Sequence, residues 1–214
     1  MRRLMLMVAG LVLLTGCGES QIKSKAVYML LDTSGTYTKE LDKAQRIANY
    51  LLASLDSGDS LAIARIDSGS FSEKDIIAKV SFDDRPSTAN DQKRKFKARL
   101  DAFVTEAKGS AHTDIMGGVL QAVEYLNESN AAERYILIFS DMEQDLTKGQ
   151  IRDFPVDMPN IRVVALNVTK LRSDNIDPRD YIERLKMWQQ RVVEGGGQWK
   201  VVNDLERLDT MIQG

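Results

Sequence analysis

The sequence predicts an α/β fold: a doubly wound, mostly parallel sheet with one short antiparallel edge strand and helices on both faces. Short apolar runs alternate along the chain with longer segments whose apolar residues recur at helical spacing. Several of these runs, residues 26–31 foremost, are apolar throughout, which is typical of strands that are buried on both faces. The runs at residues 60–66 and 76–82 are joined by too short a connection for a parallel crossover, so we expect that pair to be antiparallel.

The remaining elements follow from periodicity and from residues that favour turns. Strands are expected at residues 26–31, 60–66, 76–82, 134–140, 161–168 and 199–202. Helices are expected from about residue 38 to residue 56, at 91–107, from 114 onward, from 178 to about 194, and at 205–212. Pro178 suits the first turn of a helix, whereas Pro86 falls in a polar stretch, 83–89, that we expect to be a loop.

The composition limits the classes of function. The chain has 214 residues, of which 43% are hydrophobic and 28% charged, as in an ordinary globular domain. A net charge of -2 offers no basic face, so no nucleic-acid partner is expected. The single cysteine excludes an internal disulfide, and the single histidine argues against most zinc sites.

The first residues have the pattern of a targeting segment. Met1-Arg2-Arg3 precedes an apolar run, 4–14, that is too short to cross a bilayer. It ends in Leu14-Thr15-Gly16-Cys17, which resembles the bacterial lipobox. The resemblance implies a signal peptide (1–16), a lipidated Cys17 with a short tether (17–25) and a folded domain (26–214). Gly18 would favour the outer membrane if the host is Gram-negative. A plain secretory signal with a chance cysteine, or a cytosolic start, stays open.

Oxygen-bearing side chains follow the ends of two predicted strands and precede one helix. In open α/β sheets, ligands bind beyond the carboxyl ends of the strands. Carboxylates, hydroxyls and water are the ligands that small hard cations prefer. We therefore predict a site for Mg²⁺, or for Mn²⁺ or Ca²⁺, whose candidate ligands are Asp32, Ser34, Thr36, Thr113 and Asp141. The alternative is that these residues only cap turns and helices.

The pattern resembles the metal-ion-dependent adhesion site of von Willebrand factor A domains. Residues 32–36 read Asp-Thr-Ser-Gly-Thr, 109–115 form a glycine-led approach to Thr113-Asp114, and 139–141 read Phe-Ser-Asp. The resemblance implies that Ser34 and Thr36 bind the ion through their hydroxyls. It implies that Thr113 and the two aspartates bind it directly or through water. Thr36 stands where the family has serine, and Met142 where it often has glycine, which leaves the shape of that loop open.

The resemblance implies a non-enzymatic module of the bacterial cell envelope, held at the membrane by its lipid anchor. Its partner would be a protein that presents an acidic side chain to the ion. A metal-assisted hydrolase is an alternative, but His112 is the only histidine and no Gly-x-Ser-x-Gly or phosphate-binding glycine loop occurs. A structural lipoprotein whose metal only holds loops together is a third reading. We expect His112, Glu143 and Asp145 to be solvated loop residues.

Overall fold

The computed structural model describes residues 24–35, 37–171 and 173–213. The predictions for the signal peptide, Cys17 and Thr36 lie outside these residues. The strands are β1 (Lys25–Asp32), β2 (Ser60–Ile66), β3 (Ile76–Ser81), β4 (Glu133–Phe139), β5 (Ile161–Leu166) and β6 (Gln198–Val202). The helices are α1 (Leu41–Ser54), α2 (Pro86–Glu106), α3 (Ile115–Glu128), α4 (Pro178–Glu194) and α5 (Leu205–Gln213), with single turns η1 (Thr38–Glu40), η2 (Glu73–Asp75) and η3 (Ser173–Asn175).

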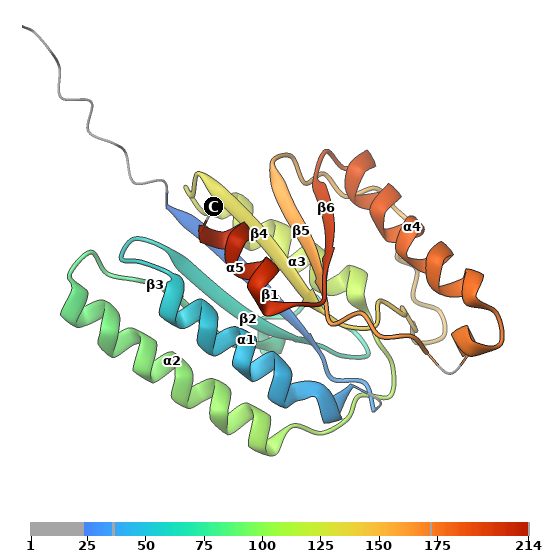
Figure 1. The fold of residues 1–214 in the computed structure, drawn as a ribbon, viewed down its shortest axis with the longest axis horizontal. Coiled ribbons are helices and arrows are strands. Elements are labelled where there is room, and N and C mark those ends of the chain that lie inside the picture. Colours follow the sequence, from blue (N-terminus) through green and yellow to red (C-terminus); the bar gives the residue numbers. More distant parts are fainter. Residues whose placement is uncertain (1–23, 36, 172, 214) are drawn as a thin grey trace, which may run out of the picture.

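The strands form one twisted sheet in the order β3-β2-β1-β4-β5-β6 (Figure 1). Every neighbouring pair is parallel except β2 and β3, as the short connection between them predicted. Strand β1 lies between β2 and β4, with Met29 opposite Ile63 on one side and Leu137 on the other. These central strands are buried on both faces, which explains why their sequences are apolar throughout. The predicted fold class is confirmed.

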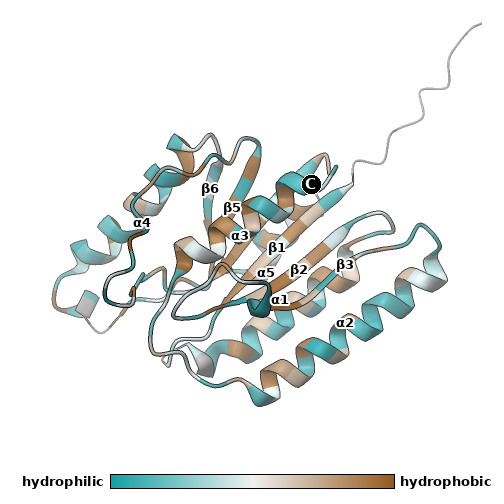
Figure 2. Ribbon diagram, turned by 180° about the vertical axis from the view of Figure 1, so that it is seen from behind, coloured by the Kyte–Doolittle hydropathy of each residue, from teal (hydrophilic) through white to brown (hydrophobic). Residues whose placement is uncertain are grey.

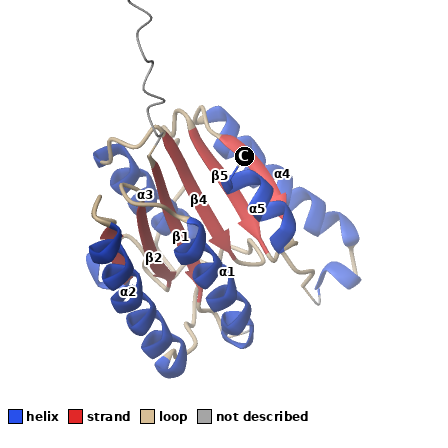
Figure 3. Ribbon diagram, turned by 60° about the vertical axis from the view of Figure 1, so that its left-hand side comes forward, coloured by secondary structure: helices blue, strands red, loops and turns tan. Residues whose placement is uncertain are grey.

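Helices cover both faces of the sheet (Figure 3). Helices α1, α2 and α5 pack on the face that carries Leu31 and Ile63. Helices α3 and α4 pack on the opposite face, against Leu30 and Ile138. The hydropathy pattern agrees: the strands are mostly hydrophobic and much of α2 and α4 is hydrophilic (Figure 2). Helix α3 lies close to the sheet at Gly118, since a Cβ at this position would come within 2.9 Å of Leu30 Cδ2. The absence of a side chain at Gly118 permits this close approach.

One element begins earlier than the sequence predicted. The stretch 83–89 was expected as a loop, but α2 already begins at Pro86. Proline suits this position for two reasons. The N–H of the first helical residue has no partner within the helix, and the fixed φ of proline is close to the helical value. Arg85, just before it, has an extended backbone, and Ala89 is buried against the core. Pro86 was expected in a loop, but it is the first residue of the helix.

The described chain enters the fold through the middle of the sheet. The Ser24 carbonyl accepts hydrogen bonds from Ala132 and Glu133, and β1 begins at Lys25. The ordered sheet thus starts slightly before the expected domain boundary at residue 26. Among the described residues, none of the helices combines the length and hydrophobicity that crossing a bilayer requires.

Candidate metal centre

Two of the predicted ligands, Asp32 and Asp141, lie at the carboxyl ends of neighbouring parallel strands. Asp32 is the last residue of β1, and Asp141 follows β4 by two residues. Because Leu31 is paired with Phe139, the next residues along, Asp32 and Ser140, meet across the sheet edge. The Ser140 hydroxyl donates a hydrogen bond to Asp32 Oδ2 at 2.6 Å. The Ser34 backbone N–H donates to Asp32 Oδ1 at 2.8 Å, which folds the first loop back over its own strand.

Backbone hydrogen bonds join the three predicted loops to one another. The Ser110 N–H donates to the Thr33 carbonyl at 2.7 Å, which ties the second loop to the first. Thr113 and Asp145 exchange two backbone hydrogen bonds, of 2.7 and 3.0 Å, which ties the second loop to the third. Together with the bond between Ser140 and Asp32, these contacts close a ring of three loops at one edge of the sheet.

The two aspartates at this edge are buried acids with raised pKa values. Asp32 is fully buried, and this burial raises the pKa of its carboxyl against the opposing hydrogen bonds from Ser140 and Ser34. The pKa of Asp141 is raised to about 6, mainly because the carboxyl is buried and in addition because of the nearby charge of Asp32. The Glu143 N–H donates to Asp141 Oδ1 at 2.9 Å and lowers the same pKa in part.

In the described part of the chain, no cationic side chain forms an ion pair with either of these aspartates, Asp32 or Asp141. The charge of Arg184 lowers the pKa of Asp141 in part, but its Nε donates to the Asp141 backbone carbonyl, at 3.1 Å, and not to the carboxylate. Two buried carboxylates that repel each other and form no described ion pair provide a chemical environment that suits a divalent cation.

The remaining donors would have to be hydroxyl groups and water. Within the described parts of the chain, no group of three His, Cys, Asp or Glu side chains is arranged to hold a metal. The donor set therefore suits a small hard ion that accepts hydroxyl and water ligands, as Mg²⁺ does, better than Zn²⁺. Ser34 is half-buried and Thr113 is buried, both in the ring of loops.

Asp114, beside Thr113, has a structural task. Its carboxylate caps α3 by accepting a hydrogen bond from the Gly117 N–H at 2.9 Å. It also forms an ion pair with Arg152, whose Nη2 lies 2.8 Å from Asp114 Oδ2. Glycine is required at 117, because a Cβ there would lie 2.4 Å from Asp114 Oδ2. The hydrogen bond from Gly117 and the ion pair with Arg152 hold Asp114 in place, and with it the backbone next to Thr113.

Met142 adopts a backbone conformation that glycine tolerates better than other residues. Its φ is +66°, in the left-handed region, and its side chain is fully buried on the α3 and α4 face of the sheet. Two side chains of α4 hold this turn: Arg184 donates to the Asp141 carbonyl, and Trp188 Nε1 donates to the Met142 carbonyl at 2.9 Å. The methionine side chain therefore adds an apolar anchor to this turn.

A fourth loop, which was not predicted from the sequence, follows β2. Asp67 Oδ1 accepts a hydrogen bond from the Ser110 hydroxyl at 2.7 Å, and the Asp67 carbonyl accepts one from the Asp114 N–H at 3.0 Å. The signal was present, since Asp67 comes directly after a buried strand, as Asp141 comes soon after another. His112 is partly exposed in its loop, as expected, and its Nδ1 lies 2.9 Å from Oδ2 of the exposed Asp145.

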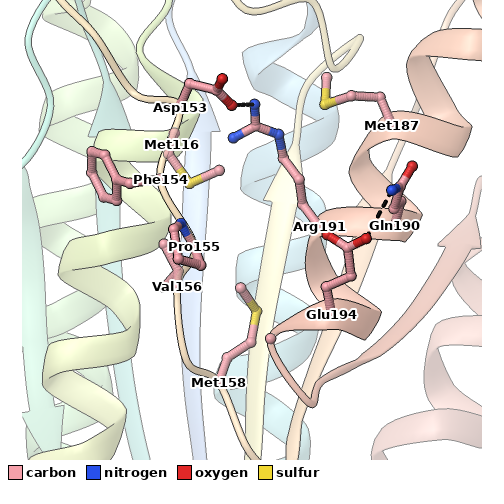
Figure 4. A pocket seen from close by; sticks show the side chains of 11 residues that line it. Met116, Asp153, Phe154, Pro155, Val156, Met158, Met187, Gln190, Arg191 and Glu194 are labelled. Carbon is pink, nitrogen blue, oxygen red and sulfur yellow. Dashed lines mark hydrogen bonds and ion pairs between the residues drawn. The ribbon is translucent and has the colours of Figure 1, made fainter.

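Helix α4 also supports the segment that carries Arg152. A cavity of about 380 Å³ lies between the start of α3, residues 153–158 and α4, and three methionines line it (Figure 4). At its rim, Arg191 forms an ion pair of 2.8 Å with Asp153, and Arg191 Nη1 donates to the Arg152 carbonyl at 3.1 Å. The helix thus supports two loops of the site, one through Arg191 and Arg152, the other through Arg184 and Trp188.

Comparison with known proteins identifies the fold. No protein-family model and no curated protein sequence matches this chain. An aerotolerance-related membrane protein from Bacteroides fragilis superimposes with a TM-score of 0.51 at 15% identity, over 89% of this chain and 96% of that one. The likeness shows the fold alone, an α/β domain with a six-stranded, mostly parallel sheet and helices on both faces. The pilus adhesin SpaC from Lactobacillus rhamnosus GG gives 0.55 at 9% identity, over 90% of this chain but 29% of its own. The minor pilin PilB from Streptococcus sanguinis gives 0.52 at 13% identity, over 89% and 60%.

Proposed function

We propose that this chain is a membrane-anchored module of the bacterial cell envelope that binds a divalent cation and uses it to hold a protein partner. One observation carries the proposal: the buried carboxylates of Asp32 and Asp141 lie at the same sheet edge without a described cationic partner. The ring of hydrogen-bonded loops around them supports it, because the ring brings donors that are far apart in the sequence to one edge.

The proposed ligand set is Asp32, Ser34, Thr36, Thr113 and Asp141, and the proposed ion is Mg²⁺, with Mn²⁺ or Ca²⁺ as substitutes. Such an ion, when bound, supplies a Lewis-acidic position that attracts a carboxylate of the partner. The chain's own residues prepare the site. Ser140 orients one oxygen of Asp32, the Ser34 N–H orients the other, and α4 fixes the turn after Asp141.

The cellular setting is also part of the proposal. Three structural neighbours are described as a membrane protein, a pilus adhesin and a minor pilin, which is compatible with a scaffold or adhesion role at the cell surface. We propose that Cys17 is lipidated and anchors the domain, at the outer membrane in a Gram-negative host. Replacing Cys17 with Ser should move the protein from the membrane fraction to the soluble fraction. An unchanged membrane fraction would contradict lipid anchoring and leave the metal site untouched.

Metal binding is tested first by stability, because no partner is needed. An ion that binds only the folded protein adds about 2.7 kcal/mol at a free concentration 100 times its Kd. For a domain of this size, that corresponds to a rise in Tm of roughly 5–10 °C. We expect this rise with Mg²⁺ and its reversal by EDTA. Asp32→Asn should abolish the rise, whereas the matched variant Asp84→Asn, at an exposed loop position, should keep it.

Partner capture then separates adhesion from a structural role. Capture that needs the ion is lost in EDTA and in Asp32→Asn. If the ion only stabilises the loops, EDTA lowers the Tm but capture persists at temperatures where the protein stays folded. Turnover of ester or phosphate substrates that disappears in Asp32→Asn would instead support the hydrolase, and the binding proposal would then be wrong.

A further inference from the structure

A groove on the opposite side of α3 from the Met-lined cavity lies between α3 and the edge strand β3. Its volume is about 310 Å³. One wall comes from α3, and the other from the β2–β3 connection and from β3 itself. It has no residue in common with the candidate metal ligands, so the inference drawn from it does not depend on the proposed function.

The sheet beneath α3 at this end carries small side chains. Ala62 and Ala64 of β2 face α3, whereas Leu61 and Ile63 face the other layer. A β-bulge in β3 shifts the register between Ile63 and Ala64, so that Ile76 and Lys79 are paired with Ala64 and Ala62 on the α3 face. Small residues and a bulge leave room between helix and sheet edge, and this room is the groove.

The groove is acidic beyond what its own cation can balance. Lys79 Nζ lies 3.1 Å from Glu73 Oε2, so these two charges neutralise each other. Glu124 and Glu128 also line the groove, and neither forms a described ion pair. They stand four residues apart in the last turns of α3, which has no basic residue in its final turn. Like charges at this spacing, and negative charge at a helix C-terminus, both destabilise a helix. A cation bound here would relieve both effects.

A buried amide and two aromatic rings complete the groove. Gln121 is only 8% exposed, and its Oε1 accepts a hydrogen bond from the Tyr28 hydroxyl at 3.0 Å. This fixes the orientation of the amide and leaves its Nε2, as a donor at the groove wall, without a partner in the described residues. Tyr125 packs edge-to-face on Tyr28 with ring centroids 5.3 Å apart. Phe71 is 51% exposed and lines the same groove.

We propose that this groove binds an arginine side chain of a protein partner. The guanidinium group pairs with Glu124 and Glu128, and the faces of Phe71 and Tyr125 offer it cation–π contacts. The Gln121 Nε2 donates to a main-chain carbonyl of the same residue. A free amine could pair with the two glutamates but has no carbonyl to accept the hydrogen bond from Gln121. For this reason we propose that the ligand is a residue of a polypeptide.

The test uses the full chain in detergent and ligand-observed NMR, with Nα-acetyl-arginine amide as the probe. The uncharged citrulline counterpart serves as its match in shape. We expect binding of the arginine compound, no binding of the citrulline compound, and no effect of EDTA. The double variant Glu124→Gln/Glu128→Gln should weaken binding about tenfold or more. Glu106→Gln/Glu183→Gln removes the same charge from exposed positions elsewhere and should leave binding unchanged.

A second variant guards against loss of folding. Phe71 has a φ of +98°, which glycine tolerates well, so Phe71→Gly removes an aromatic wall without straining the turn. It should weaken binding while the Tm is retained. Equal binding of citrulline, unchanged binding in the Glu124 and Glu128 double variant, or an equal loss in the control variant would overturn the proposal. Spermidine that binds more tightly than the arginine compound would overturn the assignment to a protein side chain.

Discussion

The ion pair between Arg152 and Asp114 should be the most sensitive polar contact near the candidate site. Asp114 is fully buried at the start of α3, and Arg152 is the one described cation that reaches it. Replacing Arg152 with Met leaves the carboxylate buried with only the Gly117 N–H as a donor. Breaking a buried pair in this way costs about 3–5 kcal/mol. Because the Arg152 side chain is 21% exposed, we expect the lower end of that range, about 3 kcal/mol.

A double-mutant cycle isolates the charge. Asp114→Asn keeps an oxygen that can cap α3 but removes the negative charge, so the double variant no longer buries an unpaired ion. We expect the double variant to be more stable than Arg152→Met alone by about 1–2 kcal/mol. Urea unfolding followed by the fluorescence of Trp188 and Trp199 measures each free energy. A loss below about 1 kcal/mol in Arg152→Met, or simple additivity in the cycle, would refute the reasoning.

Three further predictions concern the loops. The pKa of Asp141 is raised to about 6 in the folded protein, so its neutral form adds stability at low pH that the metal-free protein loses as pH rises through 6. Asp141→Asn should remove this slope in urea titrations, and Mg²⁺ affinity of the unaltered protein should fall as pH drops below 6. At Met142, where φ is +66°, Met142→Gly should be at least as stable as Met142→Ala, and a clearly more stable alanine variant would contradict the strain. At Phe71, glycine should exceed alanine by about 1 kcal/mol, as measured by the same unfolding curves.

The sequence predicted the sheet well because its strands are buried on both faces. The apolar run of β4 and the short connection between β2 and β3 can be recognised from neighbouring residues alone, without knowledge of the tertiary fold. The strand-end positions of Asp32 and Asp141 followed from the same local pattern. The structure places both at one edge, but the presence of an ion there stays a prediction.

The supporting contacts could not be predicted because they join segments without periodicity. Arg152 lies 38 residues from Asp114, and Arg184 lies 43 residues from Asp141. Both arginines could equally have been solvated, since surface arginines are common and no local pattern marks a buried one. Likewise, Pro86 starts α2 only because Ala89 packs onto the core, a contact that depends on the tertiary fold.

The direction of β1 has a consequence for how the domain would stand on a surface. The seven steps from Lys25 to Asp32 rise about 3.3 Å each, so the strand spans about 23 Å between these two residues. The polypeptide enters at one pole of the molecule, and the carboxylates lie at the other. If Cys17 carries the proposed lipid anchor, a tether pulling on Ser24 would point the ring of loops outward, away from the membrane. Force applied between the tether and a captured protein would run along the length of this central strand, which is hydrogen-bonded on both sides.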